Sequence, residues 1–143
     1  ETMLVSGSGT ASSRIGMHLA MAPGFGLIPG VIIDQHFAQR GRIGRLIGAV
    51  AHNPRILGIG IDENTAIVCG VRSCFEVIGE GAVYVLDGQD ITYTNLTDEE
   101  RDRTLSTFGM RLHVLSMGDT FDLGSRVPRY RAAEEVEEEI LDA

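Results

Sequence analysis

The triplet Asp34, Gln35 and His36 places an acid, an amide and an imidazole in a row, directly after the apolar run at 31–33. A histidine in such a place is a candidate general base. Glu63 follows another apolar run and is a candidate for the acid that holds the imidazole in one tautomer, as in a hydrolase triad. The alternative is that His36 caps a helix and Glu63 is a solvated turn residue. The residues alone leave both interpretations open.

Three arginines, Arg40, Arg42 and Arg45, follow the triplet in a stretch from 35 to 55 that contains no acidic residue. They form either a solvated helix face or a cationic cluster whose mutual repulsion a bound anion would offset. The second interpretation favours a carboxylate-rich or phosphate-bearing ligand.

Asp34 and Gln35 are candidates for local turn formation or for orienting His36. The nucleophile of a hydrolase is harder to find. The serines near the N-terminus are candidates by residue type only: Ser6, Ser8, Ser12 and Ser13. No helical pattern follows "GSGTASS", so this stretch is not a nucleophile elbow of the G-x-S-x-G kind. The remaining histidines have no metal-ligand spacing, and neither a metal nor another cofactor is expected.

The charge and the hydrophobic pattern of the chain argue against several classes of protein. The chain has 143 residues and a net charge of -8, which argues against nucleic-acid binding because such proteins need a cationic surface. No apolar run approaches the ~18 residues of a membrane-spanning helix. No signal peptide is visible, and a cytoplasmic location is expected. The two cysteines, Cys69 and Cys74, are expected to be buried free thiols.

Apolar runs bounded by glycine, proline or charged residues predict a series of strands. They lie at 3–8, 30–34, 56–62, 65–71, 74–79, 81–88 and 110–118. Residues 37–52 are expected to form a helix, because apolar residues recur on one face with helical spacing. A short polar turn or helix is expected at 97–103. The acidic tail after Val127 is expected to become helical near its end.

A strand, a helix and a strand followed by a meander predict an α/β fold with an antiparallel part. In open sheets of this kind, ligands bind outside the carboxyl ends of the strands. His36 and Glu63 each follow such an end, so the pattern places both side chains on one rim.

The long segment "PGFGLIPGVIIDQHFAQRGRIGRLIGAVAHNPRILGIGIDENTAIV" resembles the cyanophycinase family of peptidase family S51. The signature consists of "DQHF", then R-x-R-x-x-R, then "GIGIDE-x-TA". Members of this family are serine hydrolases that cut cyanophycin, a poly-aspartate backbone with arginine side chains, into β-Asp-Arg dipeptides. They have a three-layer α/β/α flavodoxin-like fold related to class I glutamine amidotransferases, and they are usually dimers.

The resemblance implies a role for each residue of the motif. His36 and Glu63 match the histidine and glutamate of a Ser-His-Glu triad. The motif positions that line the substrate pocket fall on Asp34, Gln35, Arg40, Arg42 and Arg45. A cationic pocket suits the carboxylates of cyanophycin or of an isoaspartyl peptide.

One departure from the family is expected. The nucleophile elbow of the family, G-T-S-A-G-A, is absent, and Glu1 falls a few positions after the place where it would end. Residues 1–143 are therefore interpreted as the C-terminal part of a single hydrolase domain, with a mixed sheet and antiparallel hairpins. Two other functions stay open: a non-catalytic module that binds an anion or a peptide, and a related aspartyl dipeptidase.

Overall fold

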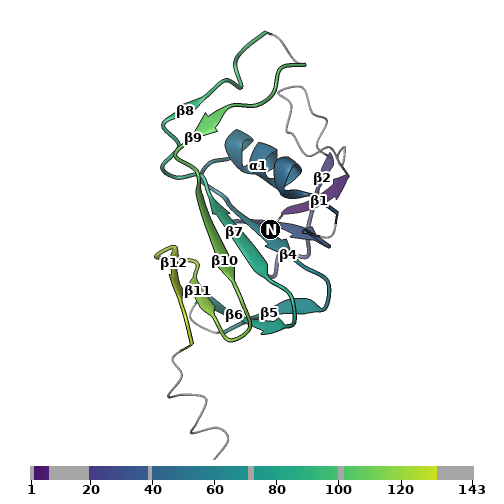
Figure 1. The fold of residues 1–143 in the computed structure, drawn as a ribbon, viewed down its shortest axis with the longest axis vertical. Coiled ribbons are helices and arrows are strands. Elements are labelled where there is room, and N and C mark those ends of the chain that lie inside the picture. The colour runs from purple at the N-terminus through teal and green to yellow at the C-terminus, as the bar shows by residue number, and fades with distance from the viewer. Residues whose placement is uncertain (1, 7–19, 39, 71–72, 100–101, 132–143) are drawn as a thin grey trace, which may run out of the picture.

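The computed structural model describes residues 2–6, 20–38, 40–70, 73–99 and 102–131. A six-stranded mixed sheet forms the centre of the fold (Figure 1), in the order β10-β7-β4-β3-β1-β2. Its strands are β1 (Thr2–Ser6), β2 (Ala20–Pro23), β3 (Val31–Gln35), β4 (Leu57–Ile61), β7 (Val83–Asp87) and β10 (Arg111–Leu115). Strands β1, β3 and β4 are parallel neighbours, whereas β2, β7 and β10 each run antiparallel to a neighbour.

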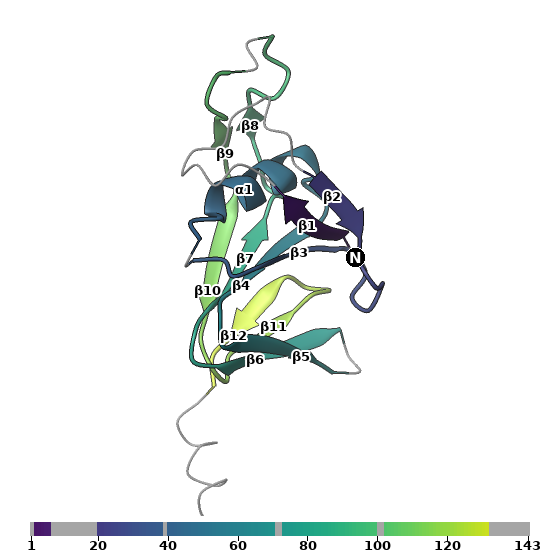
Figure 2. The ribbon, with the colours of Figure 1, turned by 90° about the vertical axis from the view of Figure 1, so that its right-hand side faces the viewer.

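A second sheet of four antiparallel strands lies against one face of the central sheet, and helix α1 (Ile43–His52) covers the other face (Figure 2). The second sheet has the order β12-β11-β6-β5. Its strands are β5 (Thr65–Cys69), β6 (Cys74–Gly79), β11 (Thr120–Asp122) and β12 (Val127–Arg129). A separate two-stranded ribbon joins β8 (Tyr93–Thr94) to β9 (Thr107–Phe108).

The apolar core is divided by the central sheet into two clusters. Alternate residues of β3 and β4, such as Val31 and Ile59, point toward the second sheet and pack with Phe75 and Phe121. On the opposite side, Ile32 packs against the helix together with the following residues: Phe37, Leu46, Ala49, Val50 and Leu86. Because β3 and β4 are covered on both faces, their continuous apolar runs are explained.

The antiparallel hairpins and the mixed sheet agree with the sequence prediction, but the layers differ in one respect. In the described part of the chain, a β-sheet occupies the face where a doubly wound fold would have its second helical layer. Strands β6 and β7 also do not form a hairpin. Strand β7 crosses into the central sheet and lies between β4 and β10.

Helix α1 begins at Ile43, six residues later than the predicted start at 37. The preceding residues form turns in which the N–H of Gly41 donates to the carbonyl of Ala38 and the N–H of Arg42 donates to that of Phe37. Gly41 has a φ of +59°, which a continuing helix does not tolerate. The helix ends at His52 before Asn53, as the Asn-Pro pair predicts.

The C-terminal part of the sequence was predicted less completely. The short strands β8, β9, β11 and β12 were not expected. Residues 100–101, within the expected turn or helix at 97–103, and the tail from 132 lie outside the described residues. Cys69 is exposed and Cys74 is half-buried, so the expectation that both thiols are buried was wrong.

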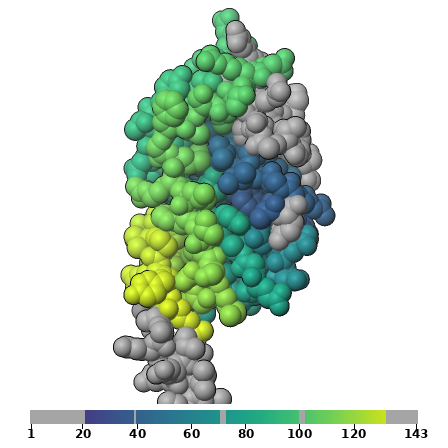
Figure 3. All heavy atoms as spheres, in the orientation of Figure 1, coloured from purple at the N-terminus to yellow at the C-terminus, as the bar shows by residue number. Residues whose placement is uncertain are grey.

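The segment from β8 to β10 covers one side of the molecule (Figure 3), next to the surface formed by the loop and helix around residues 40–52. Near the start of β4 and the end of β7, the guanidinium of Arg126 donates to the carboxylate of Asp87 and, at 2.6 Å, to the carbonyl of Arg55. These bonds connect the turn between β11 and β12 to the central sheet.

Candidate active site

The register of two parallel strands brings the candidate base and acid together. Gln35, the last residue of β3, pairs with Ile61, the last residue of β4. His36 therefore leaves the sheet beside the point where Glu63 leaves it. Helix α1 forms the connection between the two strands, so a single βαβ unit positions both side chains.

His36 and Glu63 are in direct contact. The Nδ1 atom of the imidazole lies 3.0 Å from Oε1 of the carboxylate. Both side chains are about half exposed, at 49% and 46%. With Nδ1 held by the carboxylate, Nε2 is the ring atom left to face a substrate or a nucleophile. The contact expected from the sequence is present, while the catalytic roles of both residues remain predictions.

The backbone of His36 is in the left-handed region, with a φ of +51°. Residues other than glycine adopt this conformation rarely, and histidine is one of the types that tolerate it best. Such a conformation persists where the surrounding structure fixes it, and it is frequent at functional sites. Asn64, next to Glu63, has a φ of +52°. Both strand ends thus turn sharply as they reach the site.

The pair lies in a cleft of about 370 Å³ between the end of the central sheet and β5. The cleft is lined by Gln35, His36, Ile61, Asp62, Glu63, Asn64, Thr65, Ala66 and Ile67. No serine is among these residues. The one hydroxyl among them, that of Thr65, donates to the carbonyl of Glu63 at 3.0 Å and accepts the N–H of Gly81 at 2.9 Å.

Asp34 is buried and forms an ion pair with Arg45 of helix α1. Nε of Arg45 donates to Oδ2 of Asp34 at 2.6 Å, and Nη2 donates to Oδ1. The two side chains are 0% and 5% exposed. Two parallel bonds between a guanidinium and a carboxylate make a rigid contact, which fixes the helix to the strand that carries His36.

Arg42 extends this ion pair toward the surface. Its Nη1 lies 3.5 Å from Oδ1 of Asp34 and donates to the carbonyl of Gln35. Burial and the nearby charge of Arg45 lower the pKa of the Arg42 guanidinium, while Asp34 acts in the opposite direction. Asp34 therefore offsets part of the repulsion among the arginines within the fold, while one carboxylate faces the two guanidiniums of Arg42 and Arg45.

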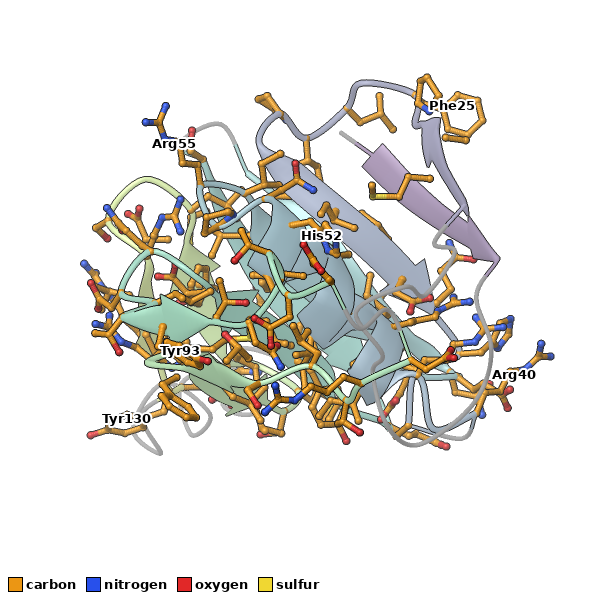
Figure 4. The ribbon with its side chains drawn as sticks, turned by 90° about the horizontal axis from the view of Figure 1, so that it is seen from above. Phe25, Arg40, His52, Arg55, Tyr93 and Tyr130 are labelled. Atoms are coloured by element: carbon orange, nitrogen blue, oxygen red, sulfur yellow. The ribbon has the colours of Figure 1, made fainter. Side chains whose placement is uncertain are left out.

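Arg40 differs from the other two arginines. Its side chain is exposed and points away from the body of the molecule (Figure 4). The motif therefore divides into two sets. Gln35 and Arg40 are exposed, and Gln35 lines the cleft, whereas Asp34 and Arg45 lie beneath the surface and contact each other.

Two of the other histidines, His52 and His113, do not join the site. His52 lies at the end of α1, where its Nδ1 is 2.8 Å from the carbonyl of Gly48. His113 of β10 packs against Phe121, and His18 lies outside the described residues. Within the described ranges, no group of three histidine, cysteine, aspartate or glutamate side chains is arranged to hold a metal ion. No helix in these ranges is long and apolar enough to cross a membrane.

The sequence interpretation missed Asp62 and Thr65, which line the cleft, and Gly81, whose N–H donates to the Thr65 hydroxyl. Asp62 is 8% exposed although it lies between two residues of the rim. A carboxylate directly after a fully apolar strand was the signal that could have identified it, since a buried carboxylate requires hydrogen-bond partners.

Comparison with curated proteins identifies the relatives of this chain. Over 123 residues, it is 43% identical to the cyanophycinase of Trichormus variabilis and 37% identical to that of Synechococcus elongatus. It is 39% identical over 125 residues to the cyanophycinase of Geminocystis herdmanii. The chain is a homologue of part of the cyanophycinases. A comparison with models of known protein families found no match.

The matched segments cover 86–87% of this cyanophycinase homologue but only 41%, 38% and 46% of the three relatives, respectively. The chain thus spans less than half the length of the proteins it matches. The homology confirms the resemblance given by the "DQHF" motif and the arginines that follow it. It does not show that this chain catalyses a reaction by itself.

Proposed function

We propose that residues 1–143 are the C-terminal part of a single serine hydrolase domain with a three-layer flavodoxin-like fold. The complete domain would be an exopeptidase that cuts cyanophycin into β-Asp-Arg dipeptides. The observation that supports this most is the 3.0 Å contact between His36 and Glu63, in a chain homologous to cyanophycinases. A homodimer is proposed from the family resemblance, and a cytoplasmic location is proposed separately.

In this mechanism, a serine hydroxyl attacks the carbonyl carbon of the scissile peptide bond while Nε2 of His36 accepts its proton. Glu63 accepts the hydrogen bond from Nδ1–H and stabilises the imidazolium. His36 then gives the proton to the leaving nitrogen, and the bond to the dipeptide breaks. Water hydrolyses the acyl-serine by the same sequence of proton transfers, which restores the hydroxyl.

The serine is proposed to come from outside residues 1–143. None of the described residues that line the cleft beside His36 is a serine, and the Thr65 hydroxyl already makes two hydrogen bonds. This assignment agrees with the length of the match, because more than half of each relative lies outside it.

The motif residues are proposed to serve substrate binding in two ways, by direct contact and by support of the pocket. Gln35 and Arg40 are exposed and would contact the substrate directly. The Arg40 guanidinium would bind a carboxylate of the substrate. Asp34, Arg42 and Arg45 would shape the pocket from beneath, because the Asp34 carboxylate holds both guanidiniums. Since Asp34 is already the partner of Arg42 and Arg45, Arg40 is the arginine of the motif that is left for an external anion.

A chimera provides the test. The chain would replace the matched segment of the Trichormus variabilis cyanophycinase, and release of β-Asp-Arg from insoluble cyanophycin would be measured. We expect release by the chimera and none by the 143-residue chain alone. An inactive but folded chimera would contradict the substrate assignment, and release by the chain alone would contradict the external nucleophile.

The same assay separates the alternatives. Cleavage of aspartyl dipeptides without cleavage of the polymer would favour a dipeptidase. Binding of cyanophycin fragments without cleavage by the chimera would favour a binding module. His36→Asn in the chimera is the matched control, since it removes the base and leaves the arginine cluster unchanged.

A further inference from the structure

Asp62 is a buried carboxylate directly between the end of β4 and Glu63. Its residue is 8% exposed, although the Glu63 side chain is 46% exposed. No guanidinium or imidazole within the described ranges forms an ion pair with it. A carboxylate in this position must be stabilised by hydrogen bonds from neutral donors, because a buried and unpaired charge is strongly unfavourable.

Two backbone N–H groups supply those hydrogen bonds. Oδ1 of Asp62 accepts the N–H of Ala38 at 2.8 Å, and Oδ2 accepts the N–H of Ala82 at 3.2 Å. The backbone of Asp62 also donates to the carbonyl of Ala82 at 3.1 Å. The partners lie 24 and 20 residues away in sequence, so these bonds join separate loops rather than form a local turn.

The bond to Ala38 matters for His36. The loop after His36 is connected to the end of β4 by two bonds, from Phe37 N–H to the Ile61 carbonyl at 3.3 Å and from Ala38 N–H to Asp62. His36, at the start of this loop, has a φ of +51°, and such a backbone conformation needs contacts of this kind to persist. One residue therefore fixes the backbone before Glu63 and the backbone after His36.

The packing beneath Asp62 requires glycine at position 81. A Cβ atom at Gly81 would lie 2.8 Å from Cβ of Asp62 and 2.5 Å from Oγ1 of Thr65. The absence of a side chain lets the turn before β7 approach closely enough for Ala82 to bond to Asp62. The carboxylate is thus held from one side by this turn and holds the His36 loop on the other.

From this geometry we propose that Asp62 is a positioning residue for the His36–Glu63 pair. It sets the distance between the imidazole and the carboxylate without touching either the substrate or the reacting atoms. The catalytic consequence rests on the proposed function, but the structural consequence can be measured without any turnover.

The first measurement uses the chain itself. In ¹⁵N NMR spectra, we expect the imidazole of His36 to be held as the Nδ1–H tautomer by Glu63. Asp62→Ala removes both acceptors, and Asp62→Asn is isosteric but can accept through only one atom. Both variants are expected to shift His36 toward a mixture of tautomers, with the larger shift in Asp62→Ala.

Asp122→Asn is the matched control. The Asp122 carboxylate also accepts two backbone N–H groups, from Gly124 at 2.9 Å and Ser125 at 2.8 Å, but it does not line the cleft. This variant is expected to lower stability and to leave the His36 spectrum unchanged. If the Asp62 variants and Asp122→Asn give the same His36 spectrum as the wild type, the proposal is overturned. If Asp62→Ala does not fold, the His36 spectrum of the isosteric Asp62→Asn variant tests the proposal instead.

The second measurement uses the active chimera. Asp62→Asn is expected to lower kcat about 100-fold with a much smaller change in KM, as expected for a displacement of about 1 Å in a catalytic group. An unchanged kcat would contradict the proposal. A chimera that cleaves no cyanophycin refutes the proposed function. In that case, the NMR spectra of His36 still test whether Asp62 positions the His36–Glu63 pair.

Discussion

Asp34 and Arg45 are joined by two parallel hydrogen bonds in the interior of the protein, between the strand that carries His36 and the helix that follows it. Arginine commonly serves at pockets as a ligand for carboxylates. Here the carboxylate is supplied by the protein, eleven residues away in sequence. The pair therefore contributes to the shape of the candidate site and to the stability of the fold.

Removal of one partner of this pair should destabilise the protein strongly. Arg45→Met leaves the buried Asp34 carboxylate with only the Arg42 guanidinium, 3.5 Å away, and removal of one partner costs about 3–5 kcal/mol of unfolding free energy in comparable pairs. Urea denaturation measures the change. The double variant Asp34→Leu/Arg45→Met should be more stable than either single variant, because neither charge is left unpaired.

The exposed ion pair between Asp98 and Arg103 is the matched control. Its atoms are 2.9 Å apart, and the side chains are 34% and 56% exposed. Arg103→Met should change the unfolding free energy by less than about 1 kcal/mol. Equal effects of Arg45→Met and Arg103→Met would show that the buried pair has no special role.

Glu63→Gln tests the orientation of the base. Glutamine keeps the size of the side chain but removes the charge that stabilises the imidazolium. In the active chimera, kcat should fall by roughly 10³- to 10⁴-fold with the unfolding midpoint nearly unchanged. Initial rates at saturating substrate and a thermal scan measure both quantities. A variant with full activity would exclude Glu63 from the triad.

Gly60→Ala should disturb the residue next to His36. A Cβ atom at Gly60 would lie 2.5 Å from Cγ of Phe37, whose ring is fully buried against the helix. Such overpacking costs about 1–3 kcal/mol, which urea denaturation detects. Gly70→Ala is the control, since its nearest neighbour, the Cys74 carbonyl, is 3.8 Å away. A loss of stability equal in both variants would contradict the packing argument.

The ionisation of Tyr84 is expected to lower the stability of the folded protein at alkaline pH. Burial, and secondly the charge of Asp62, raise the pKa of Tyr84 above its ordinary value of 10.0. The folded state therefore keeps this proton longer than the unfolded state. The contribution is complete below pH ~10 and is lost as pH rises from there through the folded pKa. Tyr84→Phe should reduce the fall in melting temperature between pH 9 and 11, and an unchanged fall would refute the assignment.

The sequence predicted the parts of the fold that depend on local pattern. The apolar runs of β3 and β4 are buried on both faces, and the C-terminal part of α1 follows the helical spacing of its apolar residues. The contact between His36 and Glu63 followed from the rule that parallel strands end at one edge. Its prediction therefore required only the strand boundaries.

The remaining features depend on contacts between distant residues. The start of α1 is delayed because the loop after His36 bonds to Asp62, 24 residues beyond Ala38. Nothing in the local pattern separates Arg45, which is buried against Asp34, from Arg40, which is exposed. Strands of two or three residues such as β8 and β11 exist only through their pairing partners, so their own sequences give little signal.

The βαβ unit that contains β3, α1 and β4 has a consequence for how this chemistry can be inherited. His36 and Glu63, the proposed base and orienting acid, both lie within the contiguous stretch 34–63, and the ion pair between Asp34 and Arg45 lies there too. A gene rearrangement that breaks the chain beyond Ala82, whose N–H donates to Asp62, would transfer the proposed proton-handling pair together with its supports. Under the proposed function, the nucleophile could then be lost or exchanged as a separate inherited unit.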